Sequence, residues 1–123
     1  MIKIYLAIPY PKIDKDLSFK IANAVSARLM NKGYCVFSPI SHSHIMARDN
    51  SLPVTWDFWK EIDAEFIKWS DELWVVELDG WQESTGVQAE IEIALSFKKT
   101  IVRVKPEFLG IDINDFRRID IEV

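Results

Sequence analysis

Apolar residues in the first part of the chain alternate between short runs and longer, periodic stretches. Residues 2–8 are largely apolar and β-branched and are bounded by two prolines, which predicts a buried strand. Residues 17–29 carry apolar side chains three or four positions apart, the period of an amphipathic helix. Gly33 follows where a left-handed cap is expected, and residues 34–37 predict a second short strand.

The same alternation continues to residue 104. A helix is predicted over 56–69, with Ile62 among its core-facing positions, and a strand over 73–78. A further helix has Ile91, Ala94 and Leu95 on its core side, and residues 100–104 predict a fourth strand. Residues 38–54 show no clear period, which predicts a long loop of the kind that is usually functional or disordered in compact domains. Residues 106–123 show no clear pattern apart from a candidate short strand over 120–123.

The order of these elements predicts an α/β fold. Short apolar strands that alternate with amphipathic helices indicate an open, mostly parallel sheet of four to five strands with helices on both faces, a flavodoxin-like or Rossmann-like three-layer sandwich. Ligands of such folds bind at the carboxyl ends of the strands. Candidate chemistry is therefore expected just after residues 8, 37, 78 and 104.

Composition narrows the class of protein. A chain of 123 residues is expected to form one domain over 1–123. The net charge of −4 argues against duplex nucleic acid or an anionic membrane as partner, and no apolar stretch is long enough to span a membrane. The only cysteine, Cys35, excludes an internal disulfide framework and a cysteine-based zinc site. A cytoplasmic location is expected.

Three residues are candidates for catalysis at the carboxyl edge. Glu90 lies in the first turns of the helix after the third strand, where its carboxylate can point into the cleft as a nucleophile or base. The more common arrangement of such an acid is a simple interaction with the helix dipole. Asp63 follows Ile62 on its helix, and a solvated acidic face is its alternative. Tyr5 lies inside the first strand, as a packed core aromatic or with its hydroxyl on a cleft carboxylate.

Further residues are candidates for substrate contact. Asp79 ends the third strand at the functional edge. His42 and His44 lie in the expected loop, and since no further metal ligand is evident, we expect contact with a sugar hydroxyl or phosphate and no metal. Trp56 and Trp59 are placed either to stack on a planar base or to pack in the core.

Four segments resemble the nucleoside 2-deoxyribosyltransferase superfamily, and more narrowly its small DUF1937 branch. They are Ile4-Tyr5-Leu6-Ala7, Gly33-Tyr34-Cys35-Val36-Phe37-Ser38-Pro39, Asp63 eight residues before Asp71, and Ser84-x-Gly86-x-x-x-Glu90. The resemblance implies that Glu90 is a glutamate nucleophile, that Asp63 handles the proton on the base, and that Tyr5 orients Glu90. It also implies cleavage of the N-glycosidic bond of a small-molecule 2′-deoxynucleoside or nucleotide, without metal or organic cofactor, by a homo-oligomer.

One position departs from the transferases. They commonly carry aspartate six residues before the nucleophile, where this chain has Ser84. The related deoxynucleoside 5′-monophosphate N-glycosidases carry serine there and use it on the 5′-phosphate, so Ser84, with Gly86 of the same motif, favours nucleotide hydrolysis. Two other classes stay open. One is a non-catalytic nucleotide-binding module on the same fold, and the other is an interaction protein with exposed tryptophans.

Overall fold

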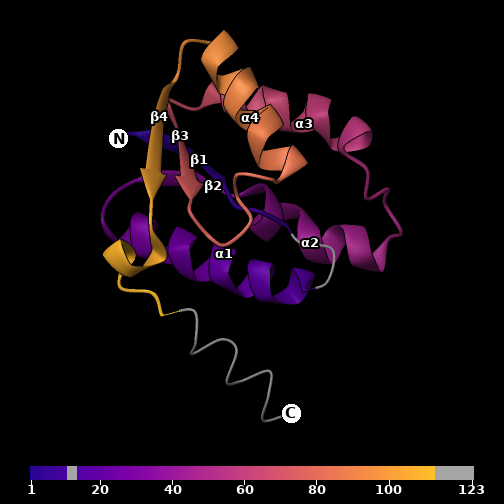
Figure 1. Cartoon of the computed structure of the whole chain (residues 1–123), viewed down its shortest axis with the longest axis horizontal. Helices are drawn as coiled ribbons and strands as arrows, with labels where there is room; N and C mark the ends of the chain where they lie inside the picture. The colour runs from indigo at the N-terminus through magenta and orange to yellow at the C-terminus, as the bar shows by residue number, and fades with distance from the viewer. Residues whose placement is uncertain (11–13, 113–123) are drawn as a thin grey trace.

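The protein is described by a computed structural model that covers residues 1–10 and 14–112 (Figure 1). A four-stranded parallel sheet in the order β2-β1-β3-β4 forms its centre. The strands are β1 (Lys3–Ala7), β2 (Cys35–Phe37), β3 (Glu72–Val76) and β4 (Thr100–Val104). The helices are α1 (Lys15–Asn31), α2 (Pro39–Asp49), α3 (Trp56–Trp69), α4 (Thr85–Ser96) and the short 3₁₀ helix η1 (Pro106–Leu109). The predicted α/β class is confirmed, and the candidate strand at 120–123 lies outside the described residues.

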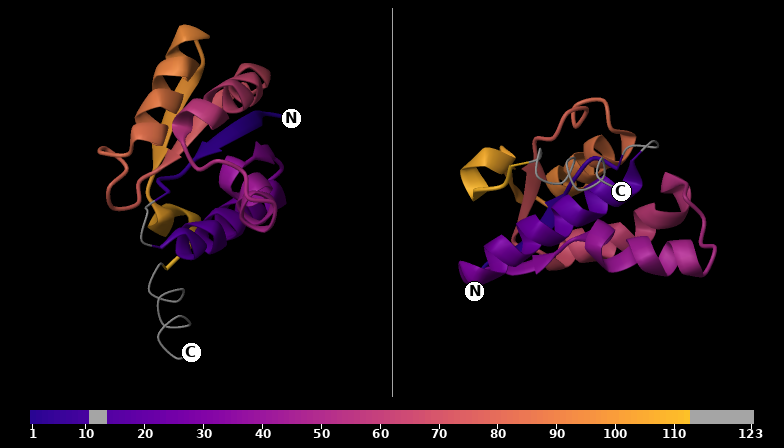
Figure 2. Two further views of the ribbon diagram at one scale, coloured as in Figure 1. Left: turned by 90° about the vertical axis from the view of Figure 1, so that its right-hand side faces the viewer. Right: turned by 90° about the horizontal axis from the view of Figure 1, so that it is seen from below.

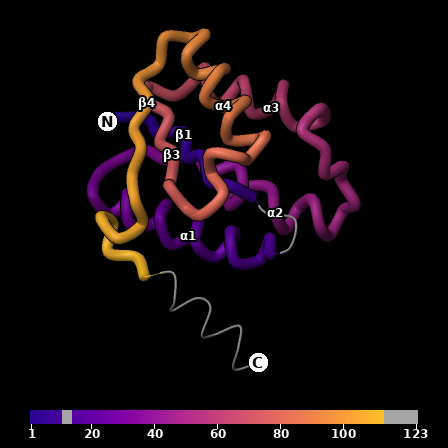
Figure 3. The backbone as a smooth tube through the Cα atoms, viewed as in Figure 1, coloured from indigo at the N-terminus to yellow at the C-terminus, as the bar shows by residue number. Residues whose placement is uncertain are grey.

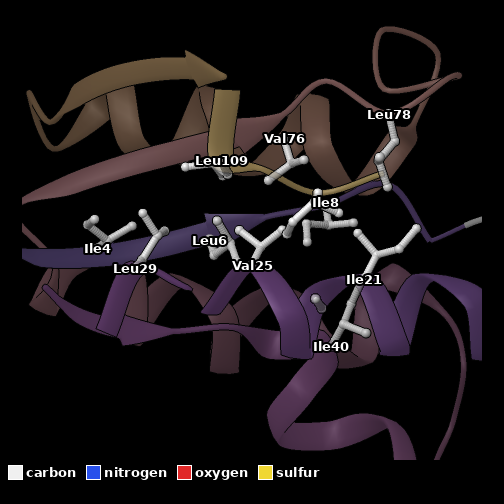
Figure 4. Close-up of a cluster of buried hydrophobic side chains, with 12 residues drawn as sticks. Ile4, Leu6, Ile8, Ile21, Val25, Leu29, Ile40, Val76, Leu78 and Leu109 are labelled. Atoms are coloured by element: carbon white, nitrogen blue, oxygen red, sulfur yellow. The ribbon is translucent and has the colours of Figure 1, made fainter. Parts of the chain in front are cut away.

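Helices cover both faces of the sheet, which gives three layers (Figures 1 and 2). Alternate residues of a strand point to opposite faces, so Ile4 and Leu6 of β1 pack against Val25 and Leu29 of α1, with Leu109 of η1 beside them (Figure 4). Tyr5 and Ala7 point the other way. They join a second buried cluster with Leu73 and Val75 of β3, Ile67 of α3, and Val87 and Ala94 of α4.

The strand order places a crevice between β1 and β3. From β1 the chain crosses to β2 on one side, whereas from β3 it crosses to β4 on the other. Such a reversal is the point at which open α/β sheets bind ligands, outside the carboxyl ends of the strands. The segments that leave these two strands, residues 8–10 and 77–84, therefore flank the expected ligand position (Figure 3).

Helix α2 lies where a long loop was predicted, so that prediction is wrong for residues 39–49. The helix is defined by its ends: Ser38 Oγ accepts a hydrogen bond from the Ser41 amide at 3.1 Å, and Pro39 occupies the first turn. Along α2 the buried positions are Ile40 and His44, four residues apart. A single apolar residue on the buried face is too few to reveal a helical period.

Two predicted core positions are exposed. Ile62 is 40% exposed and Leu95 is 57% exposed, and the buried positions beside them on α3 and α4 include Asp63 and Glu90. Gly33 has φ of 97°, which confirms the left-handed cap after α1. In the described part of the chain, no helix has the length and apolar character needed to cross a membrane.

Candidate active site

Tyr5 and Glu90 form a buried hydrogen-bonded pair at the centre of the α3–α4 face. Tyr5 has no exposed surface, and its hydroxyl donates to Glu90 Oε2. Glu90 is 5% exposed because Val87, Glu90 and Ala94 share the buried face of α4. The alternative of a surface acid at the helix dipole does not fit the buried Glu90, and Tyr5 is both a packed core aromatic and a donor to a carboxyl.

Asp63 reaches the same place from α3. It is 7% exposed and shares the buried face of its helix with Ile67, one turn further on. The charge of Asp63 and its hydrogen bonding both raise the pKa of Tyr5, so the phenol lies close to both carboxyls. Three side chains that are distant in sequence thus form one buried group. It consists of Tyr5 and of Asp63 and Glu90, which we call the carboxyl pair.

Burial controls the proton affinity of this group. Removal from water disfavours a charged carboxylate, and it raises the pKa of Glu90 to about 8, with the nearby Asp63 adding to the effect and the Tyr5 hydrogen bond opposing it. Burial likewise raises the pKa of Asp63 to about 6, against the hydrogen bonding to Tyr5. The pKa of Tyr5 lies well above its usual value, first through burial and then through the two carboxyls, so the phenol keeps its proton.

An aromatic wall lines this group on the β2 side. The rings of Phe37 and Phe66 stack with their centroids 3.8 Å apart, and the ring centroids of Phe37 and Tyr5 are 5.9 Å apart. Phe66 follows Asp63 by three residues on α3, so the two are neighbours on the helix surface. Flat aromatic faces beside carboxyls of raised pKa suit a planar group that exchanges a proton. Sequence reasoning missed both phenylalanines, although the spacing of Asp63 and Phe66 was a usable signal.

The segment between β3 and α4 places the remaining motif residues. Ser84 is the N-cap of α4, and its Oγ accepts from the Val87 amide at 3.2 Å. A side chain at Gly86 would meet no atom within 4 Å, so open space adjoins the first turn of the helix. Asp79 lies exposed in the same segment. Trp81, which sequence analysis did not single out, packs against the cluster that holds Tyr5, with the Arg103 guanidinium 5.4 Å from its ring.

The two histidines lie on α2, not in a loop, and they point in different directions. His42 is exposed, and its ring is 5.3 Å from Phe37 and 6.0 Å from Phe66, so it stands at the rim of the aromatic wall. His44 is buried and hydrogen-bonds Tyr10 and Asp16 on the α1 side. The structure therefore brings His42 toward the carboxyl pair and His44 away from it. In the described ranges 1–10 and 14–112, no three His, Cys, Asp or Glu side chains are grouped to hold a metal ion.

The two tryptophans at the start of α3 also diverge. Trp59 lies one turn before Asp63, and its Nε1 donates to the Pro53 carbonyl at 2.7 Å. Trp56 lines a groove between α3 and α4 together with Lys60, Ala64, Ala89 and Ile93. The carboxyl pair does not line that groove, so the described structure gives Trp56 no contact with the pair.

Comparison with solved structures agrees with this geometry. The chain superposes on a 2-deoxyribosyltransferase from the psychrotolerant bacterium Bacillus psychrosaccharolyticus with a TM-score of 0.58 and 27% sequence identity, over 85% of this chain and 72% of that one. The parallel sheet, its helices and this likeness place the protein in the nucleoside 2-deoxyribosyltransferase-like superfamily. A search of curated protein sequences found no match.

The family can be stated more narrowly. The model of a domain of unknown function, DUF1937, matches residues 2–105, and the chain belongs to that family. The match spans all four strands and includes Tyr5, Asp63 and Glu90.

Proposed function

We propose that this protein cleaves the N-glycosidic bond of 2′-deoxynucleosides or their 5′-monophosphates and transfers the deoxyribosyl group to another base or to water. The observation that carries the proposal is the buried Tyr5–Glu90 hydrogen bond with Asp63 beside it. Enzymes that cleave glycosidic bonds commonly use two carboxyls of unequal proton affinity, one as the acid or base and one as the nucleophile. The likeness to a 2-deoxyribosyltransferase supports the same reaction class.

In the first half of the reaction, the Glu90 carboxylate bonds to C1′ as the bond from C1′ to the base nitrogen breaks. The base leaves with the electron pair of that bond and takes a proton from Asp63. The transition state is oxocarbenium-like, and a carboxylate under C1′ stabilises its positive charge. Tyr5 donates its hydrogen bond to Glu90 and so holds the attacking carboxylate in place.

In the second half, the ester between Glu90 and the sugar is broken. A second base attacks C1′ through its nitrogen and gives transfer, whereas water gives hydrolysis. In both cases Asp63, now ionised, takes the proton of the attacking group, and Glu90 leaves as a carboxylate.

The proton must lie on Asp63 when the sugar is bound. In the free protein, Glu90 has the higher pKa of the two, about 8 against about 6 for Asp63. Positive charge that develops at C1′ stabilises the Glu90 carboxylate, because the reacting carbon lies directly over it. One proton shared between two buried carboxyls can therefore move to Asp63 and then to the leaving base.

Ser84 and Gly86 are proposed to line the sugar side of this site. They occupy the N-cap and first turn of α4, where helix amides favour a negatively charged group such as a 5′-phosphate. The aromatic wall of Phe37 and Phe66 is proposed to face the base, with His42 at its rim.

The test is chromatography of free base released by purified protein from each 2′-deoxynucleoside and each 5′-monophosphate, with and without a second base. Glu90→Gln should lower the rate on the order of 10⁴-fold, since it removes the nucleophile and keeps the shape. Glu92→Gln, an exposed change two residues away, is the matched control and should keep the rate. Binding without release of base from any substrate would overturn the proposal in favour of a non-catalytic nucleotide-binding module.

A further inference from the structure

A second cluster of polar side chains lies at the carboxyl edge of β1, outside the carboxyl pair. Tyr10 follows β1 by three residues, and its hydroxyl hydrogen-bonds Nδ1 of His44 on α2. Nε2 of the same imidazole lies 2.8 Å from Asp16 Oδ1 in the first turn of α1. Three separate elements therefore converge to hold one tyrosine side chain.

The middle member of this cluster is fixed. The His44 side chain is 5% exposed, and the Phe19 ring stacks on its imidazole at 4.7 Å. Buried ring nitrogens need hydrogen-bond partners, and both nitrogens of His44 have one. Tyr10 is 37% exposed, with the Lys15 ammonium 5.4 Å from its ring centroid, so part of the phenol stays open to a ligand.

The charge of Asp16 sets the direction of its hydrogen bond with His44. The hydrogen bond from His44 holds the pKa of Asp16 below its usual value, so Asp16 is a carboxylate and can only accept. Nε2 of His44 therefore carries a hydrogen. Burial, with the charge of Asp16, raises the pKa of Tyr10, so the phenol keeps its proton. Whether the Tyr10 hydroxyl donates to Nδ1 or accepts from it, its oxygen keeps a lone pair for a further hydrogen bond.

Tyr10 also belongs to a segment that flanks the expected ligand position. Residues 8–10 and 77–84 flank the crevice between β1 and β3. Tyr10 packs on the α1 and α2 side of the sheet, whereas Asp63 belongs to α3 on the opposite face. With the base assigned to the Asp63 side in the proposed function, the hydroxyl end of the sugar is assigned to the other side of the crevice, where the segment that contains Tyr10 leaves β1.

We infer that Tyr10 contacts the substrate through its oxygen, which accepts a hydrogen bond from a hydroxyl of the deoxyribose. His44 and Asp16 act as positioning residues, because the hydrogen bonds Tyr10–His44 and His44–Asp16 hold the phenol in place. The identity of the ligand as a deoxyribose rests on the proposed function. The position of the acceptor rests on the three hydrogen-bonded side chains alone.

The test measures binding in the Glu90→Gln background, where turnover does not interfere, by tryptophan fluorescence. Its ligands are the 2′-deoxynucleoside bound most tightly and its 2′,3′-dideoxy and 2′,5′-dideoxy analogues. Adding Tyr10→Phe should weaken binding of the parent about tenfold, the loss expected for one hydrogen bond. Tyr10→Phe should not change binding of the analogue that lacks the hydroxyl contacted by Tyr10. The unaffected analogue therefore shows whether Tyr10 contacts the 3′- or the 5′-hydroxyl.

Two further variants separate contact from structure. Asp16→Ala changes a residue whose side chain is 69% exposed, so the fold should persist while the parent nucleoside binds less tightly, by a smaller factor than for Tyr10→Phe. Tyr34→Phe removes a hydroxyl at the opposite end of the sheet, where Tyr34 packs on Trp74, and should leave binding unchanged.

Equal losses on the parent and both analogues, or no loss from Tyr10→Phe, would overturn the inference. Absence of nucleoside binding in the Glu90→Gln background would overturn it as well. Tyr10-dependent binding by a wild-type protein that releases no base would support the inference and refute the proposed function.

Discussion

At the scale of single residues, the site depends on a phenol that cannot face water. Tyr5 is fully buried in the central part of the sheet, so its hydroxyl needs an acceptor inside the protein. Glu90 supplies that acceptor and is buried in turn. The same burial that makes the two carboxyls costly to ionise also makes them able to hold and release a proton near neutral pH.

Asp63→Asn tests the role of Asp63 as proton donor. The variant should release base from ordinary 2′-deoxynucleosides on the order of 10²-fold more slowly, the usual contribution of a general acid. It should cleave 7-methyl-2′-deoxyguanosine at close to the wild-type rate, because that base already carries a positive charge and leaves without a proton. Single-turnover rates on both substrates measure the difference. Equal slowing on both would show that Asp63 serves binding or folding and not proton transfer.

At the scale of elements, α4 carries Glu90, the proposed nucleophile, on a helix that starts at the crevice. Its N-cap, Ser84, satisfies the Val87 amide, and the buried face of the helix then brings Glu90 under Tyr5. The position of Glu90 thus depends on how the first turn is capped. This gives Ser84 a structural role beside the proposed contact with substrate.

Ser84 variants separate these two roles. Ser84→Ala should lower the free energy of unfolding by about 1 kcal/mol, the usual cost of losing an N-cap. Ser84→Asp should keep the cap but disfavour 5′-monophosphates relative to nucleosides, because its carboxylate repels phosphate. Thr85→Ala, which removes an exposed hydroxyl one residue further on, is the control for stability. Urea denaturation measures the change in stability. The ratio of kcat/KM for a 5′-monophosphate to kcat/KM for its nucleoside measures the change in preference. A monophosphate preference unchanged in Ser84→Asp would contradict the proposed contact.

Prediction from sequence succeeded where an element has several apolar residues on one face. The four strands and helices α1 and α4 meet that condition, and α3, which buries only Asp63 and Ile67, shows the period through its half-buried Trp56, Trp59 and Phe66. Helix α2 buries only Ile40 and His44 and was predicted as a loop. The apolar period also assigned Ile62 and Leu95 to the core, although both are exposed. The pattern assumes that buried positions are apolar, and at this site Asp63 and Glu90 occupy them. Tyr10 and Phe37 were not singled out, because only the folded chain brings Tyr10 to His44 and Phe37 to Tyr5.

At the scale of the whole molecule, the two faces of the sheet differ in what they bury. The α1 face holds an apolar cluster that includes Ile4, Leu6 and Leu29 (Figure 4). The α3–α4 face buries a phenol and two carboxyls within its cluster. Buried ionisable groups lower stability whenever they are forced to charge, so the second face is expected to make the stability of the fold depend on pH.

Glu90→Gln tests this dependence, and its sign follows from the pKa. Folding raises the pKa of Glu90 from 4.5 to about 8, so between these values the folded state holds a proton that the unfolded state has lost. The free energy of unfolding of the wild type therefore falls as pH rises through this range, by up to about 1.4 kcal/mol per pH unit from this group. Gln is neutral throughout and still offers Tyr5 an acceptor oxygen. The variant should match the wild type near pH 4.5 and exceed it in stability at pH 8.

Urea denaturation at pH 4.5, 6.5 and 8 measures this difference, with Glu92→Gln on the exposed face of α4 as the matched control. The free energy of unfolding of the control should differ from that of the wild type by the same small amount at all three pH values. A Glu90→Gln protein whose stability relative to the wild type did not change with pH would show that Glu90 ionises without cost. The carboxylate would then be solvated in the folded protein, and the buried Tyr5–Glu90 pair on which the proposed mechanism rests would not be its resting arrangement.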